Sequence, residues 1–284
     1  MTTLRTIAEV RAATADARRD GRSIGFVPTM GALHEGHLHL IRTARRAHDL
    51  VVISVFVNPT QFDDPADLAA YPRVEDTDAA AAQAAGADLL FAPSAAEMYP
   101  DGFATTIEVG GPSERLEGAS RPGHFNGVAT VVCKLLSIVG PDVAYFGQKD
   151  AQQLAVVRRM VTDLNLPYAI QAVPTVRDDD GLALSSRNAR LAAADRERAL
   201  ALSRALRAAE ASVAGGRASA EEVLAAARAE FAARGVEPDY VELVDPITFT
   251  PLPTVDGDAL LAVAARVGDV RLIDNQPLTR NGSH

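Results

Sequence analysis

A turn rich in glycine and histidine follows the first long apolar segment of the chain. Residues 28–37 read Pro-Thr-Met-Gly-Ala-Leu-His-Glu-Gly-His. A strand, a glycine turn and a helix start together form an anion site, because free backbone N–H groups and the helix dipole point at one place. His34 and His37 lie there, where imidazoles can donate hydrogen bonds to phosphate oxygens as negative charge grows in a transition state. The turn therefore indicates phosphate chemistry.

Two other interpretations of these histidines remain open. They can form an ordinary solvated helix start, or His34, His37 and His39 can hold a metal ion. The spacing is not His-Glu-x-x-His, and His39 would lie about 200° from His37 around a helix of 3.6 residues per turn. Gly36 is also expected to interrupt the helix that such a site needs. The metal site is therefore the weaker interpretation.

A second group of chemical residues lies at 142–150, where a strand ends in Gly-Gln-Lys-Asp and a helix follows. Of the 28 basic residues, all but Lys134 and Lys149 are arginine. A lysine that persists in such a sequence can mark a place that needs a compact point charge. Lys149 is therefore a candidate phosphate ligand, although an ordinary surface position explains it equally well.

Two further polar runs lie at residues 184–188 and 56–62. Ser185, Ser186 and Arg187 suit a triphosphate tail, because serine hydroxyls and a forked guanidinium both donate to phosphate oxygens. An exposed loop or helix cap is the commoner meaning of such a run. Asn58 and Gln61 end an apolar strand with neutral amides, which fit a pocket for hydroxyls and a carboxylate. An ordinary Asn-Pro turn is the alternative.

The elements that must position these residues alternate between strand and helix. Apolar runs at 23–29, 50–57, 87–92 and 143–146 predict buried strands. Apolar spacing predicts helices at 38–47, 77–85, 128–139 and 151–164. This order is typical of a Rossmann-like, doubly wound parallel sheet in an α/β fold, which binds ligands at the carboxyl ends of its strands. The chemical residues lie in those turns.

The character of the chain changes after the polar stretch 177–181. Helical patterns at 193–213 and 219–233 precede strands at 240–244, 260–267 and 271–273. The second helix opens with Ser219 three residues before Glu222, a capping-box spacing. We therefore expect a large domain over residues 1–176 and a smaller α+β domain over residues 177–284.

Composition narrows the class of protein. The chain has 284 residues, 48% of them hydrophobic and 23% charged, as in an ordinary globular protein. The net charge of −9 argues against a nucleic-acid partner. We expect no membrane span and no secretory signal, and hence a cytoplasmic protein. The single cysteine, Cys133, lies among apolar residues and is expected to be buried.

Taken together, the motifs resemble the pantothenate synthetase family, the pantoate–β-alanine ligases, over nearly the full length. The matching strings are Val-Asn-Pro-Thr-Gln-Phe at 57–62, Arg-Pro-Gly-His-Phe at 121–125, Tyr-Phe-Gly-Gln-Lys-Asp at 145–150 and Leu-Ser-Ser-Arg-Asn at 184–188. They occur in the family's order and with about its spacing. His-Glu-Gly-His at 34–37 is shared with a wider adenylyl-transferring superfamily, and the other strings narrow the resemblance to this ligase.

The resemblance implies ATP-dependent condensation of (R)-pantoate with β-alanine through a pantoyl adenylate, with release of AMP and pyrophosphate. It also implies Mg²⁺ accompanying ATP, a C-terminal lid and a homodimer. His34, His37, Lys149 and Arg187 would be catalytic. Gln61 would hold pantoate and β-alanine, Gln153 would hold pantoate, and Asn58 would line the same pocket. The residues that would line ATP are Met30, Gly31, Ala32, Leu33, His34, Glu35, Gly36, His37, Gly147, Gln148, Lys149, Asp150, Val176, Leu184, Ser185, Ser186 and Arg187.

Three other functions remain open from the sequence. A nucleotidyltransferase of the same superfamily would want more cations in its acceptor pocket than the neutral Asn58 and Gln61 provide. A nucleotide-binding regulator without chemistry would need the same turns. A histidine-rich metal hydrolase would need the weaker metal site. Pyrophosphate exchange into ATP that depends on pantoate distinguishes the ligase from all three.

Overall fold

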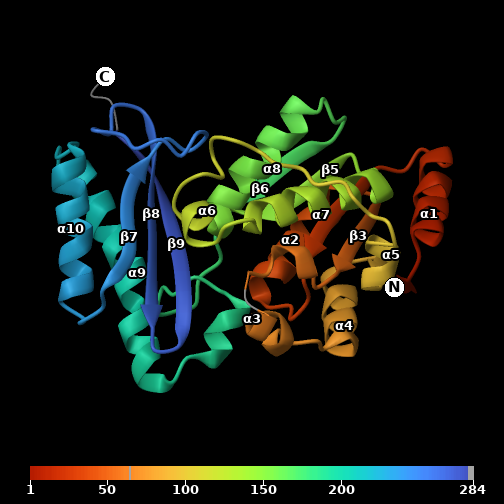
Figure 1. Cartoon of the computed structure of the whole chain (residues 1–284), viewed down its shortest axis with the longest axis horizontal. Coiled ribbons are helices and arrows are strands. Elements are labelled where there is room, and N and C mark those ends of the chain that lie inside the picture. Colours follow the sequence, from red (N-terminus) through yellow and green to blue (C-terminus); the bar gives the residue numbers. More distant parts are fainter. Residues whose placement is uncertain (64, 281–284) are drawn as a thin grey trace. The chain divides into compact units, whose positions relative to one another are not determined.

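The computed structural model of the chain describes residues 1–63 and 65–280. These residues form two compact units, one made of Met1–Gln148 with Val156–Pro174, and one that contains Lys149–Ala155 and the chain from Thr175 onward. Figure 1 shows the elements of both. We describe each unit by itself.

The N-terminal unit is built on a parallel sheet, and the part of the chain described here contributes six strands to it. Their order is β1-β4-β3-β2-β5-β6, and every neighbouring pair is parallel. The strands are β1 (Thr2–Leu4), β2 (Ile24–Thr29), β3 (Leu50–Val55), β4 (Leu89–Phe91), β5 (Val143–Gly147) and β6 (Ala169–Val173). From β2 the next strands, β3 and β4, are added on one side, whereas β5 and β6 are added on the other side. The strand order therefore reverses between β2 and β5. The predicted doubly wound α/β fold is confirmed.

Helices surround this sheet. They are α1 (Ile7–Arg19), α2 (Glu35–Ala47), α3 (Pro65–Ala70), α4 (Glu75–Ala85), α5 (Ala95–Met98), α6 (Glu117–Ser120) and α7 (His124–Val139), with the short 3₁₀ turn η1 (Pro59–Gln61). Helices α2 and α4 pack on one face over Val27, Val51 and Ile53. Residues of a strand alternate between faces, so the equally buried Phe26 and Val52 point to the other face, where α7 contacts β2.

Helix α7 is the buried centre of this unit. Eleven of its fifteen residues from Phe125 to Val139 are buried, and it ends at Gly140 in a left-handed cap. Cys133 was expected to be buried, but it is only half-buried. The expectation was wrong because its apolar neighbours in sequence occupy other sides of the helix. Burial raises the pKa of its thiol, so it is not an activated nucleophile.

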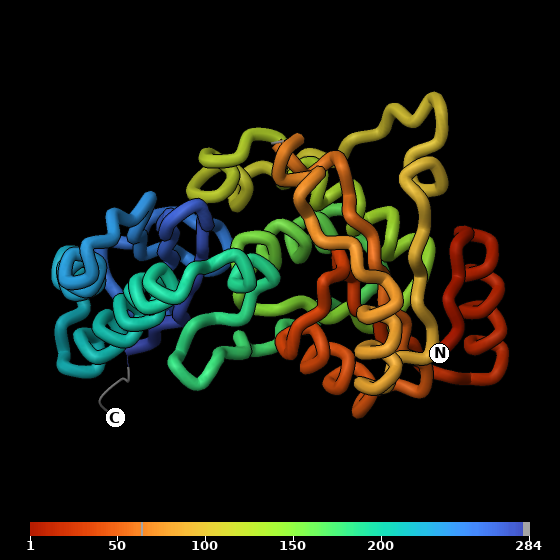
Figure 2. The backbone as a smooth tube through the Cα atoms, turned by 90° about the horizontal axis from the view of Figure 1, so that it is seen from below, coloured from red at the N-terminus to blue at the C-terminus, as the bar shows by residue number. Residues whose placement is uncertain are grey.

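The turn η2 (Gln148–Asp150) and helix α8 (Ala151–Asp163) link the two units. The C-terminal unit then contains η3 (Ser186–Arg190), α9 (Ala193–Ala214), α10 (Ala220–Ala232), β7 (Pro238–Val244), β8 (Asp258–Val267) and β9 (Val270–Thr279). The three strands form an antiparallel sheet in the order β7-β8-β9. Figure 2 shows α9 and α10 side by side. The predicted small α+β part is confirmed.

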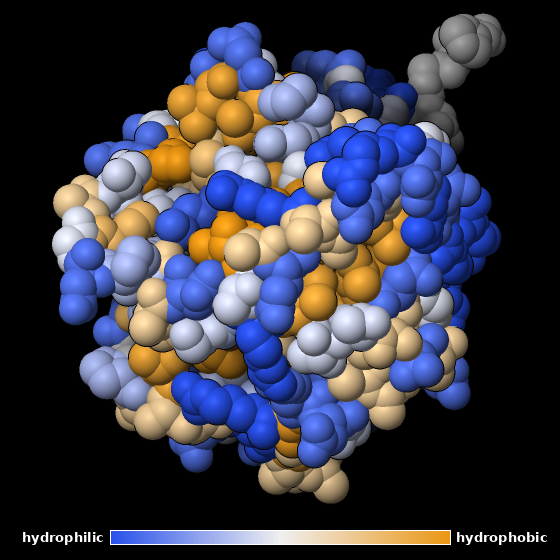
Figure 3. Space-filling view, turned by 90° about the vertical axis from the view of Figure 1, so that its right-hand side faces the viewer, coloured by the Kyte–Doolittle hydropathy of each residue, from blue (hydrophilic) through white to orange (hydrophobic). Residues whose placement is uncertain are grey.

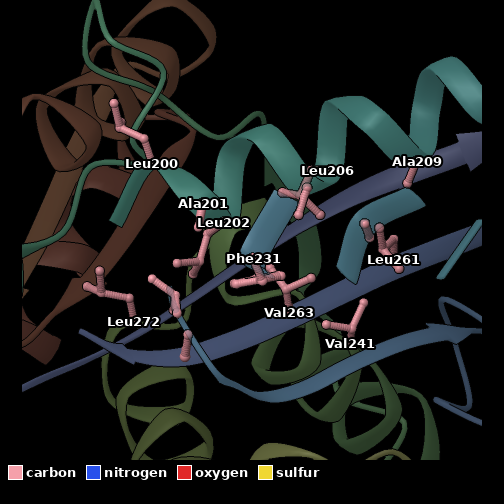
Figure 4. Close-up of a cluster of buried hydrophobic side chains, with 14 of the residues drawn as sticks. Leu200, Ala201, Leu202, Leu206, Ala209, Phe231, Val241, Leu261, Val263 and Leu272 are labelled. Atoms are coloured by element: carbon pink, nitrogen blue, oxygen red, sulfur yellow. The ribbon is translucent and has the colours of Figure 1, made fainter. Parts of the chain in front are cut away.

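This second unit has its own core. Phe231 of α10 is 1% exposed and packs with Leu202 and Leu206 of α9 and with Val263 of β8 (Figure 4). Burying large apolar side chains supplies the main driving force for folding. The unit therefore holds its shape by contacts of its own.

On the surface, hydrophobic residues are interspersed with hydrophilic ones. Figure 3 shows small hydrophobic areas separated by hydrophilic residues on one face. Within the described residues, no helix is both long and apolar enough to cross a membrane.

Candidate active site

The two motif histidines cap the start of helix α2. His34 is the N-cap, and its Nδ1 accepts the N–H of Gly36 at 3.2 Å. The Nδ1 of His37 accepts the N–H of His34 at 3.3 Å, and the two ring centroids are 4.1 Å apart. An imidazole nitrogen that accepts a hydrogen bond carries no proton, so in each neutral ring the proton lies on Nε2. Both rings are thereby fixed as Nε2–H donors.

The helix begins three residues earlier than the apolar pattern suggested. The expectation that Gly36 interrupts it was wrong, since α2 begins at Glu35 and contains Gly36 in its first turn. Backbone N–H groups there have no intrahelical partner, and the two imidazoles supply partners in place of Ser or Asp. The helix is therefore started by the same side chains that form the motif.

No metal site accompanies these histidines. Across residues 1–63 and 65–280, no group of three or more His, Cys, Asp or Glu side chains could hold a metal ion. The described residues therefore do not fit a protein-held metal centre.

The expectation that the backbone N–H groups of the turn are free needs correction. The N–H groups of Ala32 and Leu33 donate to the carboxylate of Asp78, at 2.9 and 2.7 Å. Gly31 N–H donates to the hydroxyl of Thr29 at 3.1 Å. Backbone donors of this turn are thus engaged with the protein itself, so the imidazole Nε2–H groups become its principal candidate donors to a ligand.

The buried side-chain amide of Asn58 supports the side chain of Gln61. Asn58 is 1% exposed, and its Nδ2 donates to Gln61 Oε1 at 3.0 Å and to the carbonyl of Gly127 at 3.2 Å. Its Oδ1 accepts from the Tyr99 hydroxyl at 2.8 Å. Gln61 Nε2 donates in turn to Met30 Sδ at 3.1 Å. Asn58 therefore fixes the orientation of the Gln61 amide.

Arg121 and His124, of the Arg-Pro-Gly-His string at residues 121–124, bind the backbone of the turn η1 that carries Gln61. His124 Nδ1 donates to the carbonyl of Gln61 at 2.8 Å, and Arg121 Nη2 donates to it at 3.3 Å. Arg121 also pairs with Asp63 at 3.2 Å. Burial, and then the charge of Arg121, lower the pKa of His124, so its neutral form is favoured. This string holds Gln61 in place.

In the C-terminal unit, Lys149 is held at its backbone by β9. The side-chain amide of Asn275 donates to the carbonyl of Lys149 at 2.8 Å, and Lys149 Nζ lies 3.2 Å from Asp150 Oδ1. The neighbouring Asp274, 3% exposed, forms a forked ion pair with Arg177 at 2.6 and 3.1 Å. Gln153 follows in the first turn of α8. Strand β9 therefore anchors both Lys149 and the segment that starts at Arg177.

That segment is a hairpin that ends in the serine motif. The N–H of Leu184 donates to the carbonyl of Val176 at 3.0 Å, which joins two of the residues predicted to line ATP. Ser185 caps η3, where its hydroxyl accepts the N–H of Arg187 at 3.2 Å. The helix-cap interpretation of Ser185 is confirmed. The same turn carries the Arg187 side chain.

Each unit thus contains part of the predicted set. The N-terminal unit contains Met30, His34, His37, Asn58 and Gln61, and it ends β5 at Gly147, next to Gln148. The C-terminal unit contains Lys149, Asp150, Gln153, Val176 and the residues 184–187. Sequence reasoning missed the supporting residues Asp78, Tyr99, Gly127 and Asn275.

A doubly wound parallel sheet with a histidine-capped helix after β2, at the point where the strand order reverses, defines a nucleotide-binding α/β protein. A family model described as "Pantoate-beta-alanine ligase" matches residues 2–277. The chain belongs to this family. The predicted resemblance is thereby confirmed.

Individual relatives agree with the family match. The pantothenate synthetase of Chelativorans sp. (strain BNC1) is 55% identical over 276 residues, which cover 97% of each chain. A crystal structure of pantothenate synthetase from Thermus thermophilus is 49% identical with a TM-score of 0.92, covering 97% of this chain and 99% of that one. The pantoate–beta-alanine ligase of Francisella tularensis, solved as a complex with "Beta-gamma ATP" and beta-alanine, is 37% identical with a TM-score of 0.81, covering 99% of both chains.

These findings bear on the predicted activity. Family membership confirms the prediction of an enzyme that condenses pantoate with β-alanine. It also favours that activity over the nucleotidyltransferase, the regulator and the metal hydrolase.

Proposed function

We propose that the chain condenses (R)-pantoate with β-alanine in two steps that share one adenylate intermediate. A carboxylate resists attack by an amine because its oxygen is a poor leaving group. In the first step a pantoate carboxylate oxygen attacks the α-phosphorus of ATP, and pyrophosphate leaves. In the second the amine of β-alanine attacks the carbonyl carbon, loses a proton, and AMP leaves as pantothenate forms.

The histidine pair is proposed to stabilise the first step. Charge grows on the phosphate oxygens as pyrophosphate departs, and preorganised donors aimed at that charge lower the barrier. The reciprocal hydrogen bonds of His34 and His37 support this role, because they leave each ring with an Nε2–H donor in a fixed orientation. This is the observation that carries the proposal. Lys149 and Arg187 are proposed to add positive charge on the same phosphates.

Gln61 and Gln153 are proposed to hold pantoate so that its carboxylate faces the α-phosphorus, which converts an encounter into an oriented step. Gln61 would also meet β-alanine. Asn58 is proposed to act mainly through Gln61, because its amide is buried and already bonded to the Gln61 side chain. The hydroxyl and carboxylate groups of pantoate could then be recognised by neutral amides, without a buried charge.

The remaining residues are proposed to line ATP as the family resemblance implies. They are Met30 to His37, Gly147 to Asp150, Val176 and Leu184 to Arg187. Mg²⁺ is proposed to enter with ATP, held by phosphates and water as this ion often is. It would supply charge neutralisation on the phosphates. Residues 177–284 are proposed as a lid over a nucleotide- and pantoate-binding domain of residues 1–176, and the enzyme as a cytoplasmic homodimer.

Exchange of labelled pyrophosphate into ATP tests the first step. We expect exchange only when pantoate is present, because the adenylate must form before it can be reversed. β-Alanine should not be required. Exchange that proceeds without pantoate would contradict the proposed order, and so would a strict requirement for β-alanine.

A further inference from the structure

One buried carboxylate supports the turn that carries the motif histidines. Asp78 lies in the first turn of α4 and is 2% exposed. Its Oδ2 accepts the N–H of Ala32 at 2.9 Å and its Oδ1 accepts the N–H of Leu33 at 2.7 Å. Hydrogen bonds from backbone N–H groups to an ionised carboxylate are roughly twice as strong as those between neutral groups. Asp78 therefore joins α4 to the turn across 45 residues of chain.

The turn that it holds is strained. Gly31 has a φ of +84° and Ala32 a φ of +50°, so two successive residues occupy the left-handed region. For a residue with a Cβ this conformation is unfavourable, and it persists only where the surroundings impose it. A Cβ on Gly31 would lie 2.9 Å from Asp78 Oδ2, which shows how closely the carboxylate approaches the backbone. Asp78 supplies two of the contacts that impose the turn.

A second tether holds the other side of the same turn. Thr29 accepts the N–H of Gly31 at 3.1 Å and donates its hydroxyl proton to the carbonyl of Ser54 on β3 at 2.7 Å. The turn is thus tied to β3 before Gly31 and to α4 after it. His34 follows Leu33 directly, so the position of its ring depends on these ties.

We propose that Asp78 is a positioning residue for the adenylylation step, acting through His34 and His37. Its two bonds fix the Ala32–Leu33 backbone, and this fixes where the two Nε2–H groups are presented. The inference rests on the proposed role of the histidines. Both carboxylate oxygens are occupied by backbone donors, so the side chain is not placed to act as a base.

If Asp78 acted only through its negative charge, removing that charge would be expected to raise activity, whereas loss of positioning would lower it. A negative charge near a phosphate site repels ATP, so removing that charge alone would favour binding. Asp78→Asn removes the charge while keeping the shape, but its amide nitrogen would face a backbone N–H that needs an acceptor. We expect the loss of position to dominate, because a displacement of about 1 Å at a reacting group can cost roughly a hundredfold in rate.

The experiment compares Asp78→Asn with the control Asp76→Asn by pantoate-dependent pyrophosphate exchange. Asp76 lies on the same helix turn but is exposed, and its substitution removes the same charge. We expect kcat to fall roughly tenfold to a hundredfold in Asp78→Asn, with the KM for pantoate little changed. Asp76→Asn should retain nearly full activity. Equal losses in the two variants would overturn the inference.

A double substitution separates positioning from general damage. If Asp78 acts through the histidines, its loss should matter less once His37→Ala has already removed one donor, so the two effects will be far from additive. Full additivity would overturn the inference. If His37→Ala itself retained full exchange activity, the proposed role of the histidines would fail first, and this outcome is distinguishable.

Where Asp78→Asn does not fold, Thr29→Val gives the same test, because it cuts the other tether of the turn while retaining volume. We expect Thr29→Val to lower kcat in the same direction and to show the same non-additivity with His37→Ala. Unchanged kcat in a folded Thr29→Val protein would count against positioning by this turn.

Discussion

Each motif histidine has one ring nitrogen committed to the backbone. In most helices a Ser, Thr, Asp or Asn side chain caps the first turn, whereas here two imidazoles do so reciprocally. A neutral ring held in this way carries its hydrogen on Nε2, whereas protonation would place a second hydrogen on Nδ1 and remove the acceptor that the backbone N–H uses. The cap therefore corresponds to neutral rings with an Nε2–H donor, which suits hydrogen bonding to phosphate.

Lys149 offers the sharpest single-residue prediction, because only one other lysine, Lys134, exists for comparison. We expect Lys149→Met to slow adenylate formation by about a hundredfold, since losing one charge-assisted phosphate contact raises the barrier by roughly 3 kcal/mol. Single-turnover release of pyrophosphate measures this step. Lys134→Met, which removes a lysine lying over the Phe103 ring, should leave the rate nearly unchanged. Similar rates for wild type and Lys149→Met would remove Lys149 from the mechanism.

His124 predicts a dependence of stability on pH. Burial and the Arg121 charge lower its pKa, so protonation is harder in the folded protein than in the unfolded chain. Its stabilising contribution is therefore fully present above the unfolded value, near pH 6.5, and is lost as pH falls through the lower folded value. We expect the difference in melting temperature between wild type and His124→Gln to shrink from about pH 7.5 to about pH 5. A constant difference would show that His124 does not titrate as described.

At the scale of elements, the turn η1 can approach helix α7 only because α7 carries a glycine there. A Cβ on Gly127 would lie 2.3 Å from the carbonyl oxygen of Thr60 and 2.8 Å from Gln61 Cα. These are backbone atoms, which cannot move aside as a flexible side chain can. The same glycine offers its carbonyl to Asn58. The close packing therefore sets the position of Gln61.

Gly127→Ala should move η1 away from α7 and displace Gln61. Inserting a methyl group into well-packed structure costs about 1–3 kcal/mol. If most of that free energy is expressed as displacement of Gln61, the residue proposed to bind pantoate, the KM for pantoate rises by about tenfold. The KM for ATP should change less. Steady-state kinetics with each substrate varied will check this, and a larger effect on ATP would contradict the assignment of Gln61. Gly110→Ala, on a glycine whose added Cβ meets only the Glu114 side chain at 3.5 Å, provides the control.

The central strands and most helices could be predicted from sequence, because continuous apolar runs and helical spacing mark buried elements. The strands β1 and β6 were missed, and they are the two edges of the sheet. An edge strand buries less, as in β6, where only Val173 is buried, so its apolar signal is weak. Helix α1 was also missed, although Thr6 and Glu9 have the spacing of the capping box that they form.

Strand β9 extends to Thr279, well beyond the predicted residues 271–273, for a related reason. The polar pair Asp274 and Asn275 and then Pro277 interrupt its apolar pattern. Pro277 is tolerated because β9 lies at the edge of its sheet. The polar pair is retained because it bonds to Arg177 and to the Lys149 backbone. An interruption in the pattern thus marked a structural support for Lys149 and Arg177.

The site shows the same division between residues that have a local signal and residues that do not. His34, His37, Gln61 and Lys149 stand in recognisable strings, so the sequence alone predicts them as candidates. Asp78 stands in an ordinary acidic helix start, and only tertiary structure brings it to Ala32 and Leu33. Supporting contacts of this kind join residues far apart in sequence, and no spacing rule predicts them.

At the scale of the whole molecule, the chain divides its chemical groups between two compact units. The histidines and the Gln61 amide belong to the N-terminal unit, whereas Lys149, Arg187 and Gln153 belong to the C-terminal unit. A labile adenylate needs protection from water, and closure of a lid is a common way to supply it. A lid is needed for this purpose if the intermediate is a noncovalent adenylate that must stay bound between the two steps.

The chemistry of the described residues predicts such a noncovalent intermediate. Burial raises the pKa of the Cys133 thiol, and the Ser185 hydroxyl caps η3, so neither is an activated acyl acceptor. Enzyme mixed with ATP, Mg²⁺ and labelled pantoate, but without β-alanine, should release about one pyrophosphate per site and retain an adenylate that acid quenching extracts. Adding β-alanine should convert that label to pantothenate within one turnover. Label that stays attached to denatured protein would instead require an acyl-enzyme, and pyrophosphate that appears only after β-alanine is added would require a concerted reaction.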